Sequence, residues 1–490
     1  MTDIESSSVP PGDTDRVTDS PPPPGLGLGT IPGRFALVYP IVFMLPFPLT
    51  ALTLFRGTPG YSGSWLETAI TWVVGLHGQA AQPIVTWLGH WLVGEAPSFE
   101  MTGSGDGLAA YLDVLLDFSV ATVITLAWWF WRRARPVSWR VRDASYVLVR
   151  YFLILIMFSY GFAKVFPMQF QTMGPDRLLQ PYGDSSPMGL LWTFMGASAG
   201  YQIFGGAAEV LGGALLVFRR TATLGALVVV AVMTNVFALN VFFDVPVKLY
   251  SFHYLLMAAL LVIPDLPRLF AVFVANRPAG ARDLQPFWIG SQRRHYTAIA
   301  VKLLFVLSLL GVNIYSGLED MKTRGPWAPA HELRAVYRVE SFEILPQPIP
   351  QSAAAAPGDG TPSSASTRDT AVPLPSLDAQ GTQAAVPDDV RWVRIGLNPP
   401  RSVTVQKANG LAIRMRMRLD EEASTIALYD RSLLEPDSDP LTLERLEQGR
   451  LRLSGVFEGQ SIDVTLRVDE HKSLFTTRPF RWIAEYPFNR

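Results

Sequence analysis

Seven long apolar runs constrain this chain more than any other feature, because a run of about 17 to 25 apolar residues can cross a membrane as a helix. Of the 490 residues, 49% are apolar and only 17% are charged, whereas soluble proteins average about 25% charged residues. The sequence therefore predicts a membrane α-helical bundle. The expected spans are 35–54, 108–131, 146–166, 201–218, 222–243, 249–263 and 298–315.

Basic residues gather in alternate loops between these runs. Arginines follow the second run and the fourth, and Arg268, Arg277, Arg282, Arg293 and Arg294 lie between the sixth and the seventh. One loop that faces the other way carries Glu95, Glu100 and Asp106 instead. Basic loops remain in the cytoplasm. We therefore expect a multi-pass protein with a cytoplasmic N-terminus and with everything after residue 315 outside the membrane.

Three segments do not fit a spanning pattern. Residues 1–33 are rich in Ser and Pro and lack a secretory signal, so we expect a disordered tail. Residues 65–93 are rich in Trp and Gly, which favours helical pieces lying at the membrane interface. Residues 348–387 form a low-complexity insertion. The transmembrane domain would then cover residues 34–316.

The C-terminal part, residues 317–347 and 388–490, has the period of two that is typical of strands. Apolar and basic residues alternate after Asn409-Gly410, a dipeptide that favours a tight hairpin turn. A second alternation places Ile462, Val464, Leu466 and Val468 on one face. The sequence predicts an extracytoplasmic antiparallel β domain, either a sandwich or a small barrel.

Ionisable residues inside membrane segments are costly and are therefore usually paired or functional. Counted from the outer helix ends, Glu209 and Asp117 lie roughly 13 Å deep, Asn235 about 12 Å, Asp113 about 8 Å and His253 about 6 Å. Glycines on the face of Glu209 would let another helix approach closely. These side chains, with the following Asp244, predict a polar site in the outer half of the bundle.

Lys164 lies within ~5 Å of the outer end of its helix. Its amine either extends outward to the surface or caps a carboxylate cluster and keeps it ionised. Glu209 and Lys164 are the candidate catalytic residues. The buried asparagine and histidine side chains have a structural alternative, in which they only hold helices together.

The loop after Lys164 is apolar and aromatic but contains Arg177, Tyr182 and Asp184. It is either a lid over the polar cluster or an ordinary amphipathic connector. Glycine and aspartate chemistry predicts a turn at residues 182–185, and Pro187 suits the first turn of a short helix. The candidate ligand-binding residues are Asp113, Asp117, Arg177, Tyr182, Asp184, Asn235, Asp244 and His253.

Several classes of chemistry have no support in the sequence. The chain contains no cysteine, which excludes disulfides, thiolate metal sites and cysteine nucleophiles. The six histidines show no metal-ligand spacing, and no haem or nucleotide motif is present. The net charge of −1 gives no indication of nucleic acid binding.

The runs "YGFAK", "GGAAEVLGGALLVFRRT" and "ALNVFFDVPVK" resemble the DoxX-like group of bacterial membrane proteins. They are also distantly similar to the transmembrane domain of vitamin K-dependent γ-carboxylases, without a carboxylase catalytic signature. Lys164, Glu209 and Arg219 are the matching positions, within residues 146–275. The resemblance implies a four-helix module of the bacterial inner membrane, near quinone or lipid. This chain departs from the group in its further helices and its β domain.

Two functions remain open. One is a membrane enzyme or redox partner acting on a quinone-like or lipid molecule, with Glu209 transferring a proton. The other is a non-enzymatic assembly factor whose periplasmic β domain binds a partner protein.

Overall fold

The computed structural model describes residues 30–56, 58, 61–100, 102–132, 135–281, 284, 292–345, 386–431, 433, 435–437 and 439–470. The expected N-terminal tail and low-complexity insertion lie almost entirely outside these ranges. The chain divides into two compact units. The helical unit runs to Phe162 and resumes over Ala207–Ser316, and the barrel unit comprises Ala163–Gly206 and the chain from Gly317 onward.

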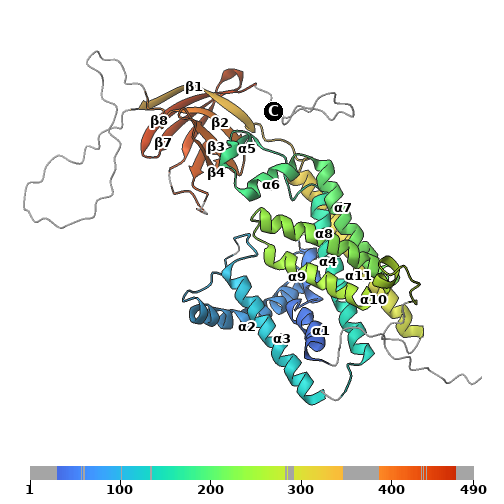
Figure 1. Ribbon diagram of the computed structural model, residues 1–490. Coiled ribbons are helices and arrows are strands. Elements are labelled where there is room, and N and C mark those ends of the chain that lie inside the picture. The colour runs from blue at the N-terminus through green and yellow to red at the C-terminus, as the bar shows by residue number, and fades with distance from the viewer. Residues whose placement is uncertain are drawn as a thin grey trace, which may run out of the picture. The chain divides into compact units, whose positions relative to one another are not determined.

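Helices make up the first part of the chain (Figure 1). They are α1 (Ile31–Phe43), α2 (Trp65–Leu92), α3 (Leu108–Arg132), α4 (Trp139–Val165), α5 (Pro175–Leu178), α6 (Pro187–Gly196), α7 (Ala199–Leu216), α8 (Ala222–Phe242), α9 (Lys248–Val262), α10 (Leu266–Phe273) and α11 (Gln292–Thr323). Short 3-10 turns η1 (Leu49–Phe55), η2 (Tyr182–Asp184) and η3 (Ile263–Asp265) lie between them.

Five stretches of the described chain are long and apolar enough to cross a membrane. They are α3, α4, α8, α11 and Lys248–Phe273, in which α9, η3 and α10 follow one another. The predicted class of helical bundle plus β domain is confirmed. Two of the seven expected runs are not among the five. The first run is broken, because α1 has only 13 residues and η1 follows it. The fourth run forms α7, which carries the polar residues Gln202 and Glu209 among its glycines.

The Trp-rich segment forms one helix instead of the expected pieces. Helix α2 continues for 28 residues with Pro83 inside it. It is not one of the five candidate spans. Its tryptophans Trp65, Trp72, Trp87 and Trp91 are all strongly exposed. Its place at a membrane interface stays a prediction.

The helical unit is packed around α4, whose residues Leu153, Ile154, Met157 and Phe158 are almost completely buried. Glycines of α7 make the close approach that the sequence predicted. A Cβ on Gly213 would lie 3.0 Å from the Phe158 ring of α4, and one on Gly212 would lie 2.8 Å from Val229 of α8. Small residues thus let α7 lie directly against both neighbours.

Eight antiparallel strands close into a barrel in which β1 pairs with β8. They are β1 (Ala335–Leu345), β2 (Trp392–Asn398), β3 (Ser402–Lys407), β4 (Ala412–Asp420), β5 (Thr425–Tyr429), β6 (Leu441–Arg445), β7 (Arg450–Phe457) and β8 (Gln460–Val468), with η5 (Glu447–Gly449) before β7. Apolar side chains fill the interior, as is typical of eight strands.

The predicted alternation and hairpin are confirmed in the barrel. Strands β3 and β4 pair around Asn409-Gly410, and Gly410 has a φ of 89°, which favours glycine. Met415 and Met417 of β4 point into the core. On β8, Ile462, Val464 and Leu466 are buried, whereas Val468 is exposed.

The short helix α5 belongs to the barrel unit and lies against its strands. Asp176 of α5 is 1% exposed, and its Oδ2 lies 2.6 Å from Nη2 of Arg414 on β4. The Ser402 hydroxyl donates to the same oxygen at 2.9 Å. Gly396 of β2 permits this approach, because a Cβ there would lie 2.3 Å from the Pro175 carbonyl oxygen. A buried ion pair thus attaches α5 to the barrel.

We expect Gly225→Ala to destabilise the helical unit. A Cβ at Gly225 would lie 2.7 Å from the backbone nitrogen of Leu216, and backbone cannot move as a side chain can. Such overpacking costs about 1–3 kcal/mol, which thermal unfolding followed by tryptophan fluorescence would detect. The control is Gly311→Ala in the same unit, where a Cβ meets no described atom within 4 Å. Equal melting temperatures for the two variants would contradict this packing.

We expect Asp176→Asn to destabilise the barrel unit by about 2 kcal/mol, because the partly buried charge of Arg414 loses its ionised partner. Asp388→Asn is the control, since Asp388 is 67% exposed in its ion pair with Arg391 and exposed pairs contribute about 1 kcal/mol or less. The unfolding midpoints in detergent measure both effects. A loss no larger than that of the control would show that α5 is not attached through this carboxylate.

Candidate functional site

Three helices bring a tyrosine, a histidine and an aspartate together inside the helical unit. The Tyr39 hydroxyl of α1 lies 2.7 Å from Nε2 of His253 on α9. Asp117 of α3 is within electrostatic range of Tyr39. All three side chains are less than 10% exposed. The structure therefore brings together two residues predicted from sequence, Asp117 and His253, and adds Tyr39.

Hydrogen bonds fix the tautomer of the neutral His253 ring. Its Nδ1 lies 2.7 Å from the Leu249 carbonyl oxygen, and a carbonyl can only accept. Nδ1 therefore carries the hydrogen, and Nε2 accepts from the Tyr39 hydroxyl. The Phe43 ring stacks on the imidazole with centroids 4.2 Å apart. The arrangement can pass a proton between a phenol and an imidazole in an apolar surrounding.

A row of tyrosines extends from this centre to Glu209. Tyr250 interacts electrostatically with Asp113 and Asp117, and its ring lies 6.4 Å from that of Tyr254. The Tyr254 hydroxyl is hydrogen bonded to that of Tyr160, which is within electrostatic range of Glu209.

Glu209 and Tyr254 are 2% and 6% exposed, whereas Tyr250 is 36% exposed. Hydroxyl and carboxyl groups of the helical unit thus follow one another from Asp117 to Glu209.

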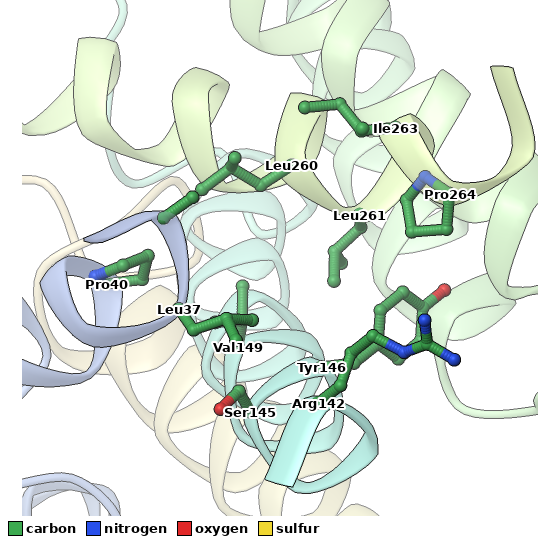
Figure 2. Close-up of a pocket in the computed structure, with 11 residues that line it drawn as sticks. Leu37, Pro40, Arg142, Ser145, Tyr146, Val149, Leu260, Leu261, Ile263 and Pro264 are labelled. Carbon is green, nitrogen blue, oxygen red and sulfur yellow. The ribbon is translucent and has the colours of Figure 1, made fainter. Parts of the chain in front are cut away.

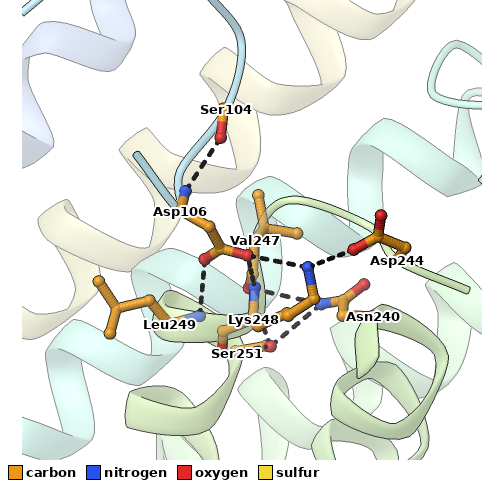
Figure 3. Close-up of polar contacts among 8 residues, drawn as sticks. All are labelled: Ser104, Asp106, Asn240, Asp244, Val247, Lys248, Leu249 and Ser251. Atoms are coloured by element: carbon orange, nitrogen blue, oxygen red, sulfur yellow. Dashed lines mark hydrogen bonds and ion pairs between the residues drawn. The ribbon is translucent and has the colours of Figure 1, made fainter. Parts of the chain in front are cut away.

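Asp106 holds the start of α9 in place. Its two carboxylate oxygens accept hydrogen bonds of 2.9 Å from the backbone N–H groups of Lys248 and Leu249 (Figure 3). The Lys248 amine lies 3.5 Å from Asp106 and 2.9 Å from Asp244. Since Val247 at the helix start has no side chain that can accept, Asp106 caps α9 from 142 residues away. Asp106 thereby positions the helix that carries His253.

The remaining candidates of the helical unit lie outside the Tyr39–His253 centre. Asn235 is exposed on α8. Asn240 of the same helix is buried and donates to the Ser251 hydroxyl at 3.0 Å. Asp244 is 80% exposed and pairs with Lys248. Asp113 is half-buried and within electrostatic range of His77 on α2. These contacts give Asn240 a structural role.

Lys164 and Arg219, which carry the family resemblance with Glu209, have different surroundings. Lys164 is 8% exposed in the last turn of α4 and belongs to the barrel unit. Arg219 follows α7 and forms a bidentate ion pair of 2.7 and 2.8 Å with Asp143 of α4. Arg219 thus connects two helices of the helical unit.

Arg177, Tyr182 and Asp184 belong to the barrel unit. The Arg177 guanidinium donates to the Gln180 side chain at 2.5 Å and to the Gly189 carbonyl at 3.2 Å. Burial, and next the charge of Arg414, lower the pKa of Arg177. Tyr182 and Asp184 are exposed in η2. The predicted turn is confirmed, and α6 begins at Pro187 as expected.

A small cavity of about 90 Å³ lies between α1, α4 and α9. Figure 2 shows its mainly apolar wall, to which Leu37, Pro40, Val149 and Leu261 contribute, with Arg142 and Tyr146 at one side. None of the side chains of the Tyr39–His253 centre lines it. In the described part of the chain, no group of three histidine, aspartate or glutamate side chains is placed to hold a metal ion.

Sequence reasoning missed Tyr39 and the capping role of Asp106. Tyr39 lies among apolar residues of the first run, and Asp106 lies in a polar loop. Tyr39 could have been noticed because a tyrosine hydroxyl inside an apolar run needs a hydrogen-bond partner when it is buried. No local pattern connects Asp106 to α9.

We expect Asp106→Ala to lower the unfolding free energy by about 1–2 kcal/mol, because two N–H groups at the start of α9 lose their acceptor. Asp244→Asn is the control, since it removes an exposed negative charge from the same lysine, keeps a residue type that tolerates the φ of 50° at this position, and costs about 1 kcal/mol at most. Thermal unfolding of both variants in detergent tests the difference. If the two variants lower the unfolding midpoint by the same amount, the Asp106 carboxylate does not stabilise the start of α9.

Comparisons with known proteins find a relative but no assigned activity. No family model matches the chain, and no solved structure matches it. The chain is 32% identical over 144 residues to Uncharacterized protein YwoB of Bacillus subtilis (strain 168). The matched stretch is 29% of this chain and 91% of that protein. Because nearly all of YwoB is covered at this identity, the chain belongs to the same family as YwoB.

Proposed function

We propose that this chain is a multi-pass protein of the bacterial plasma membrane that binds a quinone-like or lipid molecule and exchanges protons with it. The N-terminus is cytoplasmic and the barrel is periplasmic in this proposal. Five stretches that are long and apolar enough to cross a membrane support the membrane setting. The DoxX-like resemblance of Lys164, Glu209 and Arg219 favours a molecule of this class.

The observation that carries the proposal is the row of hydroxyl, imidazole and carboxyl groups between His253 and Glu209, of which His253, Tyr254 and Glu209 are buried. An apolar interior does not solvate such groups, so each one costs free energy unless it is paired or used. A quinone or lipid headgroup offers carbonyl or hydroxyl oxygens that hydrogen bond to phenol and carboxyl groups. In this proposal Glu209 is the proton-transferring group, and the hydroxyls of Tyr160 and Tyr254 are the polar groups next to it.

The proposal rests on groups of the helical unit. Lys164, Arg177 and Tyr182 belong to the barrel unit and have no assigned role in it. No haem, nucleotide or metal motif is visible in the sequence, so electrons for a redox step come from a partner protein.

Mass spectrometry of the protein extracted in native membrane patches tests the proposal. We expect the wild type to retain one quinone or lipid species and Glu209→Gln to retain at least ten-fold less of it, because the amide replaces the carboxyl group that hydrogen bonds to that molecule in this proposal. Thr234→Ala is the control, since it changes an exposed polar side chain of α8 that is not a candidate for ligand binding.

Bulk lipid alone on all three proteins would contradict the proposal. The polar row would then only hold the helices together. The assembly-factor function, in which the barrel binds a periplasmic protein, would become the better explanation.

A further inference from the structure

A second and larger cavity of about 590 Å³ lies in the helical unit, between α4, the start of α11 and the turn after α1. Its apolar wall includes Phe47, Val147, Leu148, Tyr151, Val301 and Phe305. None of these residues belongs to the Tyr39–His253 centre or to the row leading to Glu209. The volume is within the range of small-molecule sites, about 300–1,000 Å³.

The charged lining of this cavity has one sign. Arg293, Arg294 and Lys302 contribute to it, and no carboxylate does. All three lie on α11, where Arg294, Ala298 and Lys302 follow at a spacing of four and therefore share one face. The Lys302 amine lies 5.1 Å from the centre of the Phe218 ring. The cavity thus joins an apolar wall to a positive edge.

A buried arginine lies behind the same wall. Arg150 is 2% exposed, and its guanidinium carbon is 5.3 Å from the centre of the Tyr151 ring, which lines the cavity. Its Nε and Nη1 have no hydrogen-bond partner among the described residues. An incompletely paired cation next to the cavity makes the region still more favourable for an anion.

From this geometry we propose that the cavity binds one anionic phospholipid. The phosphate lies against Arg293, Arg294 and Lys302, and an acyl chain lies along the apolar wall. Helix α11 is one of the candidate spans and carries these arginines in its first turn. Basic residues at the end of a span lie at the level of lipid headgroups. A soluble anion would leave the apolar wall without a partner.

The test is a titration of the purified full-length protein in detergent, followed by native mass spectrometry. The probes are palmitoyl-oleoyl phosphatidylglycerol and the zwitterionic phosphatidylcholine with the same chains. We expect the wild type to bind phosphatidylglycerol at least tenfold more tightly. Each basic residue near a lipid surface contributes roughly fivefold in affinity, so the triple variant Arg293→Gln/Arg294→Gln/Lys302→Gln loses roughly a hundredfold.

The matched control is Arg140→Gln/Arg220→Gln/Arg277→Gln, which removes the same charge from exposed arginines of the helical unit that do not line the cavity. We expect it to keep the preference for phosphatidylglycerol. Equal losses in the two triple variants would overturn the proposal, because the attraction would then come from net charge alone.

A second variant, Ala298→Trp, fills the cavity and leaves its three charges in place. We expect this variant to bind phosphatidylglycerol at least tenfold more weakly than the wild type. Its melting temperature stays near that of the wild type, since Ala298 is only partly buried. Unchanged binding in this variant would overturn the proposal, because the acyl chain would not occupy the cavity.

Discussion

Polar side chains buried among apolar helices organise the helical unit, because neither lipid nor a packed core can satisfy them. Arg34 of α1 is fully buried and donates to the carbonyl oxygens of Trp128, Arg132 and Arg135 around the end of α3. Asp106 accepts from the first N–H groups of α9. Each contact satisfies helix ends that would otherwise remain unpaired. Together they fix α1, α3 and α9, the three helices that bring Tyr39, Asp117 and His253 together.

The same constraint separates structural polar residues from candidates for function. Arg219 has a bidentate carboxylate partner, and Asn240 has the Ser251 hydroxyl. Such partners explain why Asn240 can be buried and Arg219 partly buried. The row from His253 to Glu209 is the candidate for function, because it brings several ionisable groups together within an apolar bundle. Its groups come from α1, α3, α4, α7 and α9, so it exists only in the packed bundle.

Much of the fold was predictable from local pattern. Apolar runs marked the helices, and the alternation around Asn409-Gly410 marked a β hairpin. The local pattern failed in the lengths of two helices. The first run divides into a 13-residue helix and a 3-10 turn, whereas the Trp-rich segment, in spite of Pro83, is one long helix. A single proline removes only one hydrogen bond, and the turns on either side remain.

The sequence by itself determined the two classes of structure, helical bundle and β domain, because hydrophobic period and run length are local properties. It also identified Asp113, Asp117, Glu209 and His253 as unusual, since an ionisable residue in an apolar run is visible without a structure. Only the tertiary structure decided which of them meet. Barrel closure depends on β1 pairing with β8, the cap of α9 depends on a residue 142 positions away, and the partner of His253 lies 214 positions away. Pairings at such separations arise from packing of the whole chain, which no local pattern records.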